Sequence, residues 1–169
     1  MTEAREELGQ YGTGHDERTY MEPRMNHPVA VVPGALEALQ GLSKAADKTG
    51  VPSATVMMVA LRASQINGCS FCCEMHAREL REAGESEERI ATVAAWREAP
   101  WFSDAERAAL ALTEAVTRIA DRPESITDEI WAVAAEHYDE AQLGGLLIDI
   151  GAINVWNRLN AATRTLAGS

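Results

Sequence analysis

The chain has 169 residues and a formal net charge of −11, from 15 Lys and Arg against 26 Asp and Glu. A chain of this length can bury an ordinary hydrophobic core in one domain, so it needs no disulfide bond to fold. The acidic balance, without a basic run anywhere, excludes strong attraction to a phosphate backbone, and we expect no nucleic-acid partner.

Residues 1–25 are polar and show no sustained apolar period, which predicts an N-terminal extension that is loose unless it docks on a neighbour. This segment lacks the apolar stretch of a secretory signal, and no later window approaches the ~18 apolar residues that a membrane span requires. We therefore expect a cytoplasmic protein without a membrane partner, whose single domain covers residues 26–169.

Helical periodicity and capping residues predict about seven helices after the extension. They are expected at 35–48, 53–66, 70–84, 86–100, 103–120, 127–138 and 140–167. No segment shows the alternation of apolar and polar residues that is typical of a strand. The predicted fold class is all-α, a single-domain helical bundle.

The last predicted helix is apolar on more than one side, which indicates burial within the domain or against another subunit. Its glycines would allow close backbone approach, and we expect a homo-oligomer. The same helix carries a polar run, for which we expect hydrogen bonds in an interface or a pocket wall. The glycines are Gly144, Gly145 and Gly151, and the polar run is Asn154, Asn157, Arg158 and Asn160.

The most informative stretch is "QINGCSFCCEMHAREL", which contains all three cysteines of the chain. Cys72 and His76 are four residues apart, so on a helix they share a face and the imidazole can take a proton from the thiol. Cys69 lies just before that helix, where the free amides and the helix dipole favour a thiolate. This arrangement indicates a dithiol that cycles to a disulfide.

Two other interpretations of these residues remain open. Cys69, Cys72 and His76 are all zinc ligands, and a catalytic zinc site needs only three from the protein. Against zinc, the other histidines are isolated and no second pair of cysteines supplies a fourth structural ligand. A helix that merely buries small sulfur side chains is the remaining alternative, and it is the simplest explanation of Cys73.

The segments "LRASQINGCSFCCEMHARELREAGESEERI", "WREAPWFSDAERAALALTEAVT" and "AINVWNRLN" resemble the alkylhydroperoxidase-like (AhpD-like) branch of the carboxymuconolactone decarboxylase family. The family motif CxxCxxxH maps onto Cys69, Cys72 and His76. The resemblance implies an all-α fold, assembly into trimers or hexamers, and antioxidant, thiol-dependent reduction of organic hydroperoxides. It also implies a thiol reductant or adaptor protein as electron donor, and no metal or organic cofactor.

One position departs from the family pattern. In peroxidase-active members a glutamate about twelve residues before the first cysteine, roughly three helical turns, joins the histidine in a proton relay. Here that position is Met57, and a thioether cannot carry a proton. The peroxidase is therefore expected to be weakened or repurposed, unless Glu106 or Glu114 on a later helix substitutes.

Aromatic side chains offer a pocket for an organic substrate. Phe71 lies between the two cysteines and Trp156 lies on the last helix, beside Asn157 and Arg158. Together with Met57 they are predicted to line a pocket over the thiols or to lie in an interface. Tryptophans at helical spacing are more often core or interface anchors, and this alternative stays open for Trp156.

The leading functional hypothesis is a thiol oxidoreductase with Cys72 and His76 as the reactive pair and Cys69 as the other half of the disulfide. The order in which the two cysteines react stays open. A second hypothesis is a non-redox lyase or isomerase that acts on a small organic acid or biosynthetic intermediate and uses His76 for proton transfer. A third is a non-enzymatic redox sensor.

Overall fold

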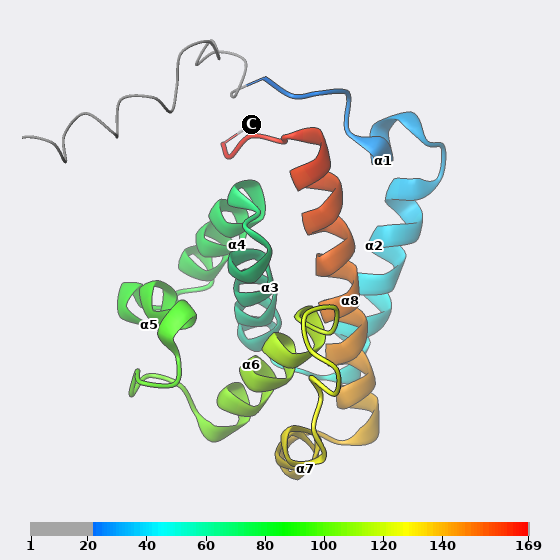
Figure 1. Cartoon of the computed structure of the whole chain (residues 1–169). Coiled ribbons are helices and arrows are strands. Elements are labelled where there is room, and N and C mark those ends of the chain that lie inside the picture. Colours follow the sequence, from blue (N-terminus) through cyan, green and yellow to red (C-terminus); the bar gives the residue numbers. More distant parts are fainter. Residues whose placement is uncertain (1–21, 169) are drawn as a thin grey trace, which may run out of the picture.

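The computed structural model describes residues 22–168, so most of the predicted N-terminal extension lies outside the described residues. The described part forms α-helices and two short 3-10 helices and contains no strand, which confirms the all-α fold class (Figure 1). The α-helices are α1 (Pro28–Val31), α2 (Ala35–Ala46), α3 (Ser53–Asn67), α4 (Ser70–Glu82), α5 (Glu87–Thr92), α6 (Asp104–Thr117), α7 (Asp128–His137) and α8 (Glu140–Thr163). The 3-10 helices are η4 (Asp47–Thr49) and η5 (Val93–Ala95).

The predicted helix ends are explained by local hydrogen bonds. Ser103 and Glu106 form the capping box that starts α6, as the sequence predicts. Gly68 has a φ of 68°, a left-handed conformation that suits glycine, and it ends α3 directly before the first cysteine.

Two segments differ most from the sequence prediction, and α8 ends at Thr163 instead of the predicted residue 167. The helix expected over 86–100 ends at Thr92 and continues as η5 and turns. This break turns the Trp96 side chain into the core, where its Nε1 donates a hydrogen bond to Glu114 Oε1 at 3.0 Å. The four-residue helix α1 was not predicted, because it is shorter than one apolar repeat; His27 caps it and Pro28 occupies its first turn.

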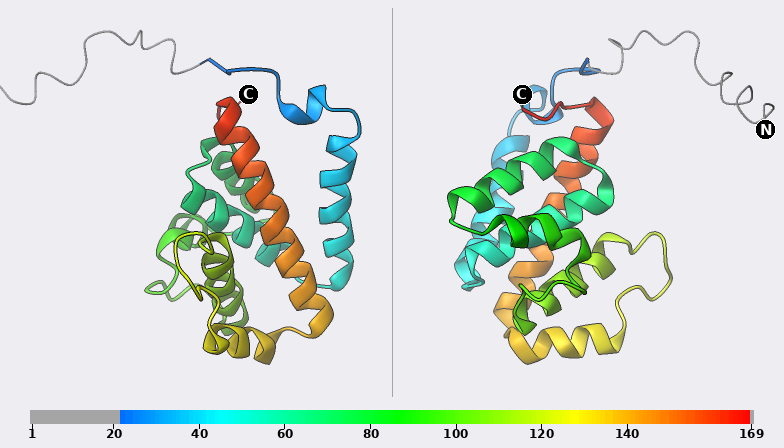
Figure 2. Two further views of the ribbon diagram at one scale, coloured as in Figure 1. Left: turned by 45° about the vertical axis from the view of Figure 1, so that its right-hand side comes forward. Right: turned by 90° about the vertical axis from the view of Figure 1, so that its left-hand side faces the viewer.

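Helix α3 lies at the centre of the bundle and packs against α4, α6 and α8. One apolar cluster joins α3 and α4 to η5 and the loop before α6, and the second joins α3 to α6, α7 and α8. Helix α2 packs along α8, on the side of α8 away from α4 in the left view of Figure 2. No helix within residues 22–168 is long and apolar enough to cross a membrane.

The last helix, α8, is buried on several sides, as expected. One of its glycines, however, packs within the chain and not against another subunit. Gly145 faces η4, and a Cβ added there would meet the side chain of Thr49, so this glycine serves contact within the chain. Gly144 and Gly151 have open space around the Cβ position. Ile148 and Val155 on α8 remain exposed.

The segment before α1 is anchored at the end of α8. The backbone N–H of Arg24 donates to the carbonyl of Thr163 at 2.8 Å, and its Nη1 donates to the carbonyl of Ala162 at 2.8 Å. These contacts fall within the predicted extension 1–25, whose boundary with the domain stays a prediction.

Glu114 on α6 is a buried acceptor that ties three parts of the chain together. Its carboxylate accepts hydrogen bonds from Arg62 Nε at 2.7 Å, Arg97 Nη1 at 2.6 Å and Trp96 Nε1, and it pairs with Arg118 at 3.5 Å. Burial alone would raise the pKa of this carboxyl, but the hydrogen bonds from Arg97, Trp96 and Arg62 bring it below its usual value.

Removal of this carboxylate is expected to destabilise the fold. Glu114→Ala leaves Arg62 and the Trp96 N–H buried without their acceptor, which costs about 3 kcal/mol or more in the free energy of unfolding. Denaturant unfolding followed by circular dichroism measures this loss, with Glu136→Ala at an exposed position of α7 as the control. Equal midpoints for the two variants would contradict the structural role of Glu114.

Candidate active site

The turn between α3 and α4 brings the two predicted redox cysteines together. Cys69 is the N-cap of α4, and its Sγ accepts the backbone N–H of Cys72 at 3.3 Å. The Cα atoms of the two residues are 5.4 Å apart, and a disulfide bond joins their sulfurs. Both side chains are buried, so the two sulfurs lie inside the domain and not on its surface.

Cys73 lies apart from this pair. It is the free cysteine of the described chain, half-buried, and it packs against the apolar cluster that contains Met58 and Leu80. Burial raises the pKa of its thiol, so it forms a thiolate less readily than an ordinary cysteine. These surroundings agree with the interpretation of Cys73 as a small core side chain.

His76 has a carboxylate partner on its own helix. Its Nδ1 lies 2.8 Å from Glu79 Oε2, and this hydrogen bond is the main cause of the lowered pKa of Glu79. The other ring nitrogen, Nε2, is buried and has no hydrogen-bond partner among residues 22–168. With a proton on Nδ1 donated to Glu79, Nε2 presents a lone pair, which is the arrangement of a general base oriented by a carboxylate.

The predicted substitute carboxylates are used elsewhere. Glu114 binds arginines and a tryptophan as described, and Glu106 accepts hydrogen bonds from Arg89 Nη2 at 2.5 Å and from the backbone of Ser103. Neither lines the cavity that contains His76. Glu79 was missed by sequence reasoning, although its position three residues after His76 on one helix is a signal that could have found it.

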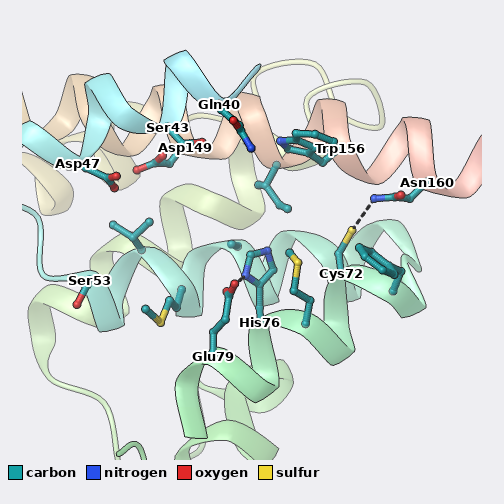
Figure 3. A pocket seen from close by; sticks show the side chains of 16 residues that line it. Gln40, Ser43, Asp47, Ser53, Cys72, His76, Glu79, Asp149, Trp156 and Asn160 are labelled. Atoms are coloured by element: carbon teal, nitrogen blue, oxygen red, sulfur yellow. Dashed lines mark hydrogen bonds and ion pairs between the residues drawn. The ribbon is translucent and has the colours of Figure 1, made fainter. Parts of the chain in front are cut away.

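A cavity of about 510 Å³ opens beside Cys72 and His76 (Figure 3). Met57, Phe71 and Trp156 line it, as predicted, and its wall is mostly apolar. The full lining is Gln40, Ser43, Asp47, Ser53, Val56, Met57, Ala60, Phe71, Cys72, Met75, His76, Glu79, Asp149, Ile153, Trp156 and Asn160. These residues come from α2, η4, α3, α4 and α8.

The polar run on α8 forms a hydrogen-bonded ladder next to the cysteines. Asn160 Nδ2 donates to Cys72 Sγ at 3.3 Å (Figure 3), and Asn157 Nδ2 donates to Ser64 Oγ at 3.0 Å. Asn67 Nδ2 donates to both Asn157 Oδ1 and Asn154 Oδ1. The ladder fixes the start of α4 against α8, as the expectation of buried hydrogen bonds required.

Two residues of the predicted pocket lie outside it. Asn157 is buried in the ladder, and Arg158 is exposed and donates to the Oδ1 and carbonyl oxygen of Asn154. Neither contributes to the wall of the cavity.

The other sulfur faces a second hollow. Cys69 lines a depression of about 330 Å³ together with Gly68, Ser70 and the C-terminal end of α8. Asn160 borders both spaces. Cys72 and Cys69 therefore border different spaces.

A carboxylate pair lies at one end of the larger cavity. Asp149 on α8 is buried, and burial together with the nearby charge of Asp47 raises its pKa from 3.8 to about 6. Sequence reasoning missed both residues, since an aspartate on an apolar helix carries no motif. No group of three His, Cys, Asp or Glu side chains within residues 22–168 is arranged to hold a metal ion.

Comparison with known proteins agrees with this geometry. The model of the carboxymuconolactone decarboxylase family matches residues 33–115. The protein YdfG of Bacillus subtilis, itself uncharacterised, is 35% identical over 139 residues, which are 82% of this chain and 93% of YdfG.

Solved structures share the fold. ATU0492 of Agrobacterium tumefaciens, a protein of unknown function for which the antioxidant defence role of AhpD is suggested, superposes with a TM-score of 0.80 at 33% identity, over 88% of this chain and 99% of that one. The debrominase Bmp8 superposes with a TM-score of 0.70 at 22% identity, over 81% and 73% of the two chains, and shows the fold alone.

One conclusion follows from the extent of the match to YdfG and ATU0492, from the matching family model and from the shared helical fold. The chain belongs to the carboxymuconolactone decarboxylase family.

Proposed function

We propose that this protein is a thiol-dependent oxidoreductase that reduces organic hydroperoxides through Cys69 and Cys72. The observation that carries the proposal is the joint placement of Cys72, one half of a disulfide-forming pair, and a carboxylate-oriented imidazole at one apolar cavity. A cavity of this size and polarity suits a small organic molecule.

Cys72 is the sulfur that attacks in this proposal. It lines the larger cavity with His76, one helical turn further along α4. His76 Nε2 accepts the thiol proton, and Glu79 stabilises the imidazolium that results. The N–H of Asn160 stabilises the thiolate, because a hydrogen bond from a donor favours the charged sulfur.

The thiolate sulfur attacks the terminal oxygen of the hydroperoxide. The S–O bond forms as the O–O bond breaks, the peroxide accepts two electrons, and the alkoxide takes the proton held by His76 and leaves as an alcohol. Cys69 then attacks the sulfur of the sulfenic acid, water leaves, and the disulfide forms. An external thiol reductant or adaptor protein returns the disulfide to the dithiol, and the hollow beside Cys69 gives it a separate approach.

The alternative of a lyase or isomerase that acts on a small organic acid fits the cavity less well. Among the lining residues Asp47, Glu79 and Asp149 are acidic, and none is Lys or Arg. A carboxylate substrate would enter without a cationic partner, at a considerable cost in desolvation. A non-enzymatic sensor would form the disulfide but would not turn over peroxide in the presence of reductant.

We also propose a homo-oligomer, a trimer or hexamer by family resemblance. Leu36 and Leu42 on α2 and Ile148 and Val155 on α8 are large apolar side chains that remain exposed on the single chain. Burial of such side chains between copies is favourable.

We also propose a cytoplasmic location, because a redox dithiol that must be reduced repeatedly suits that compartment.

The carboxylate of Glu79 is expected to increase the rate of hydroperoxide reduction. Glu79→Gln should lower the rate of hydroperoxide consumption by about tenfold to a hundredfold, because a neutral amide no longer stabilises the His76 imidazolium. The measurement is peroxide consumption with an excess of a dithiol reductant. The matched control is Glu82→Gln, an exposed residue on the same helix.

Cys72→Ser and Cys69→Ser should both abolish this turnover, whereas Cys73→Ser should retain it. No peroxide consumption by the wild-type protein would contradict the proposed reaction. Equal rates for Glu79→Gln and the control would contradict the role of Glu79.

Asp149 should make stability depend on pH. Because its pKa in the folded protein is raised, the folded state binds more protons than the unfolded state between pH 3.8 and about 6, and stability falls as the pH rises through this interval. Asp149→Asn should raise the free energy of unfolding by about 1–3 kcal/mol at neutral pH and by little near the lower bound. Denaturant titrations of the wild type and the variant, at neutral pH and near pH 3.8, measure this change in the free energy of unfolding. A change of the same size at both pH values would contradict the prediction.

The assembly proposal has a direct test. Light scattering at micromolar concentration should give a mass that is a multiple of 18.3 kDa. Replacement of exposed Leu42 and Val155 by serine should reduce the mass toward that of one chain, while the exposed polar control Gln40→Ser should not. A single-chain mass for the wild type would exclude the oligomer.

A further inference from the structure

One face of α8 forms a continuous wall of the larger cavity. Asp149, Ile153, Trp156 and Asn160 are spaced by four, three and four residues, so their side chains follow one line along the helix, and all four line the cavity. At the helical rise, the eleven residue steps from Asp149 to Asn160 correspond to about 16 Å. The cavity therefore has a reactive end at Cys72 and a remote end at Asp149 (Figure 3).

Asp149 is an acceptor without a partner. Its residue is only 8% exposed, and no described side chain or backbone group forms a hydrogen bond or ion pair with it. Figure 3 shows its carboxylate near Ser43 and Asp47, on the side of α8 that faces the cavity. Buried carboxylates are normally hydrogen-bonded or paired, because an uncompensated charge is costly.

The neighbouring charges do not compensate Asp149. Asp47 ends α2 beside it and adds a second negative charge, which contributes to the raised pKa of Asp149. The other titratable groups at the cavity, His76 and Glu79, are hydrogen-bonded to each other. The remote end thus has negative potential, and a cationic donor is the group that it attracts.

We propose that Asp149, with Asp47 beside it, binds a protonated amine at the remote end of an elongated organic substrate whose reacting group lies at Cys72. The inference rests on the proposed function for the identity of the reacting group. The middle of the substrate is apolar, because Met57, Ile153 and Trp156 line the space between the two ends. The ammonium group supplies the hydrogen bonds that the buried carboxylate lacks.

Mixed disulfides of thionitrobenzoate with ω-substituted alkanethiols test this specificity without peroxide. The reduced protein attacks the alkyl sulfur, the probe S–S bond breaks, and the coloured thionitrobenzoate anion leaves. The second cysteine then attacks the mixed disulfide and releases the alkanethiol. The protein dithiol loses two electrons and the probe gains them.

Three probes separate charge from length: aminoundecyl, hydroxyundecyl and aminoethyl. The first has a chain long enough to reach Asp149 from Cys72 and carries the ammonium group; the second has the same chain without charge; the third is charged but too short. The wild-type protein should react with the aminoundecyl probe roughly tenfold to a hundredfold faster than with the hydroxyundecyl probe at subsaturating concentration. The aminoethyl probe should gain no such advantage.

The Asp149→Asn variant should lose most of this amine-to-alcohol rate ratio, and Asp47→Asn should reduce it partly. Asp121→Asn, which removes one exposed negative charge from a loop away from the cavity, is the matched control and should keep the wild-type ratio. The ratio within each variant cancels changes in thiol reactivity, and circular dichroism confirms that each variant is folded.

A wild-type ratio near one, or a ratio that Asp149→Asn leaves intact, would overturn the inference. Failure of the proposed peroxidase would look different. In that case the reduced protein would still show the amine preference with the disulfide probes, while organic hydroperoxides would leave its thiols unoxidised.

Discussion

The contact between α8 and the start of α4 determines where the two sulfurs of the disulfide lie. Asn160 donates to Cys72 Sγ, and the ladder through Asn157 and Asn67 fixes α8 against the end of α3. The Cys69–Cys72 turn is thereby held between two helices, with one sulfur at each of two hollows. Buried amide ladders of this kind specify a single packing arrangement, because any shift would leave several polar groups unsatisfied.

The proposed proton relay rests on the geometry of a single helix. Cys72, His76 and Glu79 lie four and three residues apart on α4, so the thiol, the base and the carboxylate share one helix face. This differs from the family pattern, in which the carboxylate comes from the preceding helix at the position of Met57. With the carboxylate on α4, Met57 is free to contribute apolar surface to the cavity.

The sequence predicted what depends on local pattern. Capping residues and apolar periodicity located α3, α4 and α6 closely, and the CxxCxxxH spacing identified Cys69, Cys72 and His76 before any geometry was known. Glu79 was equally predictable, because it follows His76 by three residues on one helix, whereas the family pattern points to the preceding helix. Glu106 and Glu114, which were predicted as possible substitutes, serve as structural acceptors.

What the sequence could not predict depends on contacts between distant helices. The positions of Asp47 and Asp149 at one cavity arise from the packing of α2 along α8, which no periodicity encodes. The break of the helix after Thr92 likewise depends on tertiary contacts, because Trp96 reaches the buried carboxylate of Glu114 only from a turn. Intrinsic helix propensity does not depend on such long-range contacts, so it could not predict them.

The most direct test of the central claim is to map the bond that peroxide creates. Fully reduced protein is treated with one equivalent of an organic hydroperoxide, free thiols are alkylated, and the digested chain is analysed by mass spectrometry. The account predicts that Cys69 and Cys72 become bridged while Cys73 is alkylated, with one molecule of alcohol formed per bridge. A bridge that includes Cys73, or three alkylated cysteines after exposure to the hydroperoxide, would contradict it.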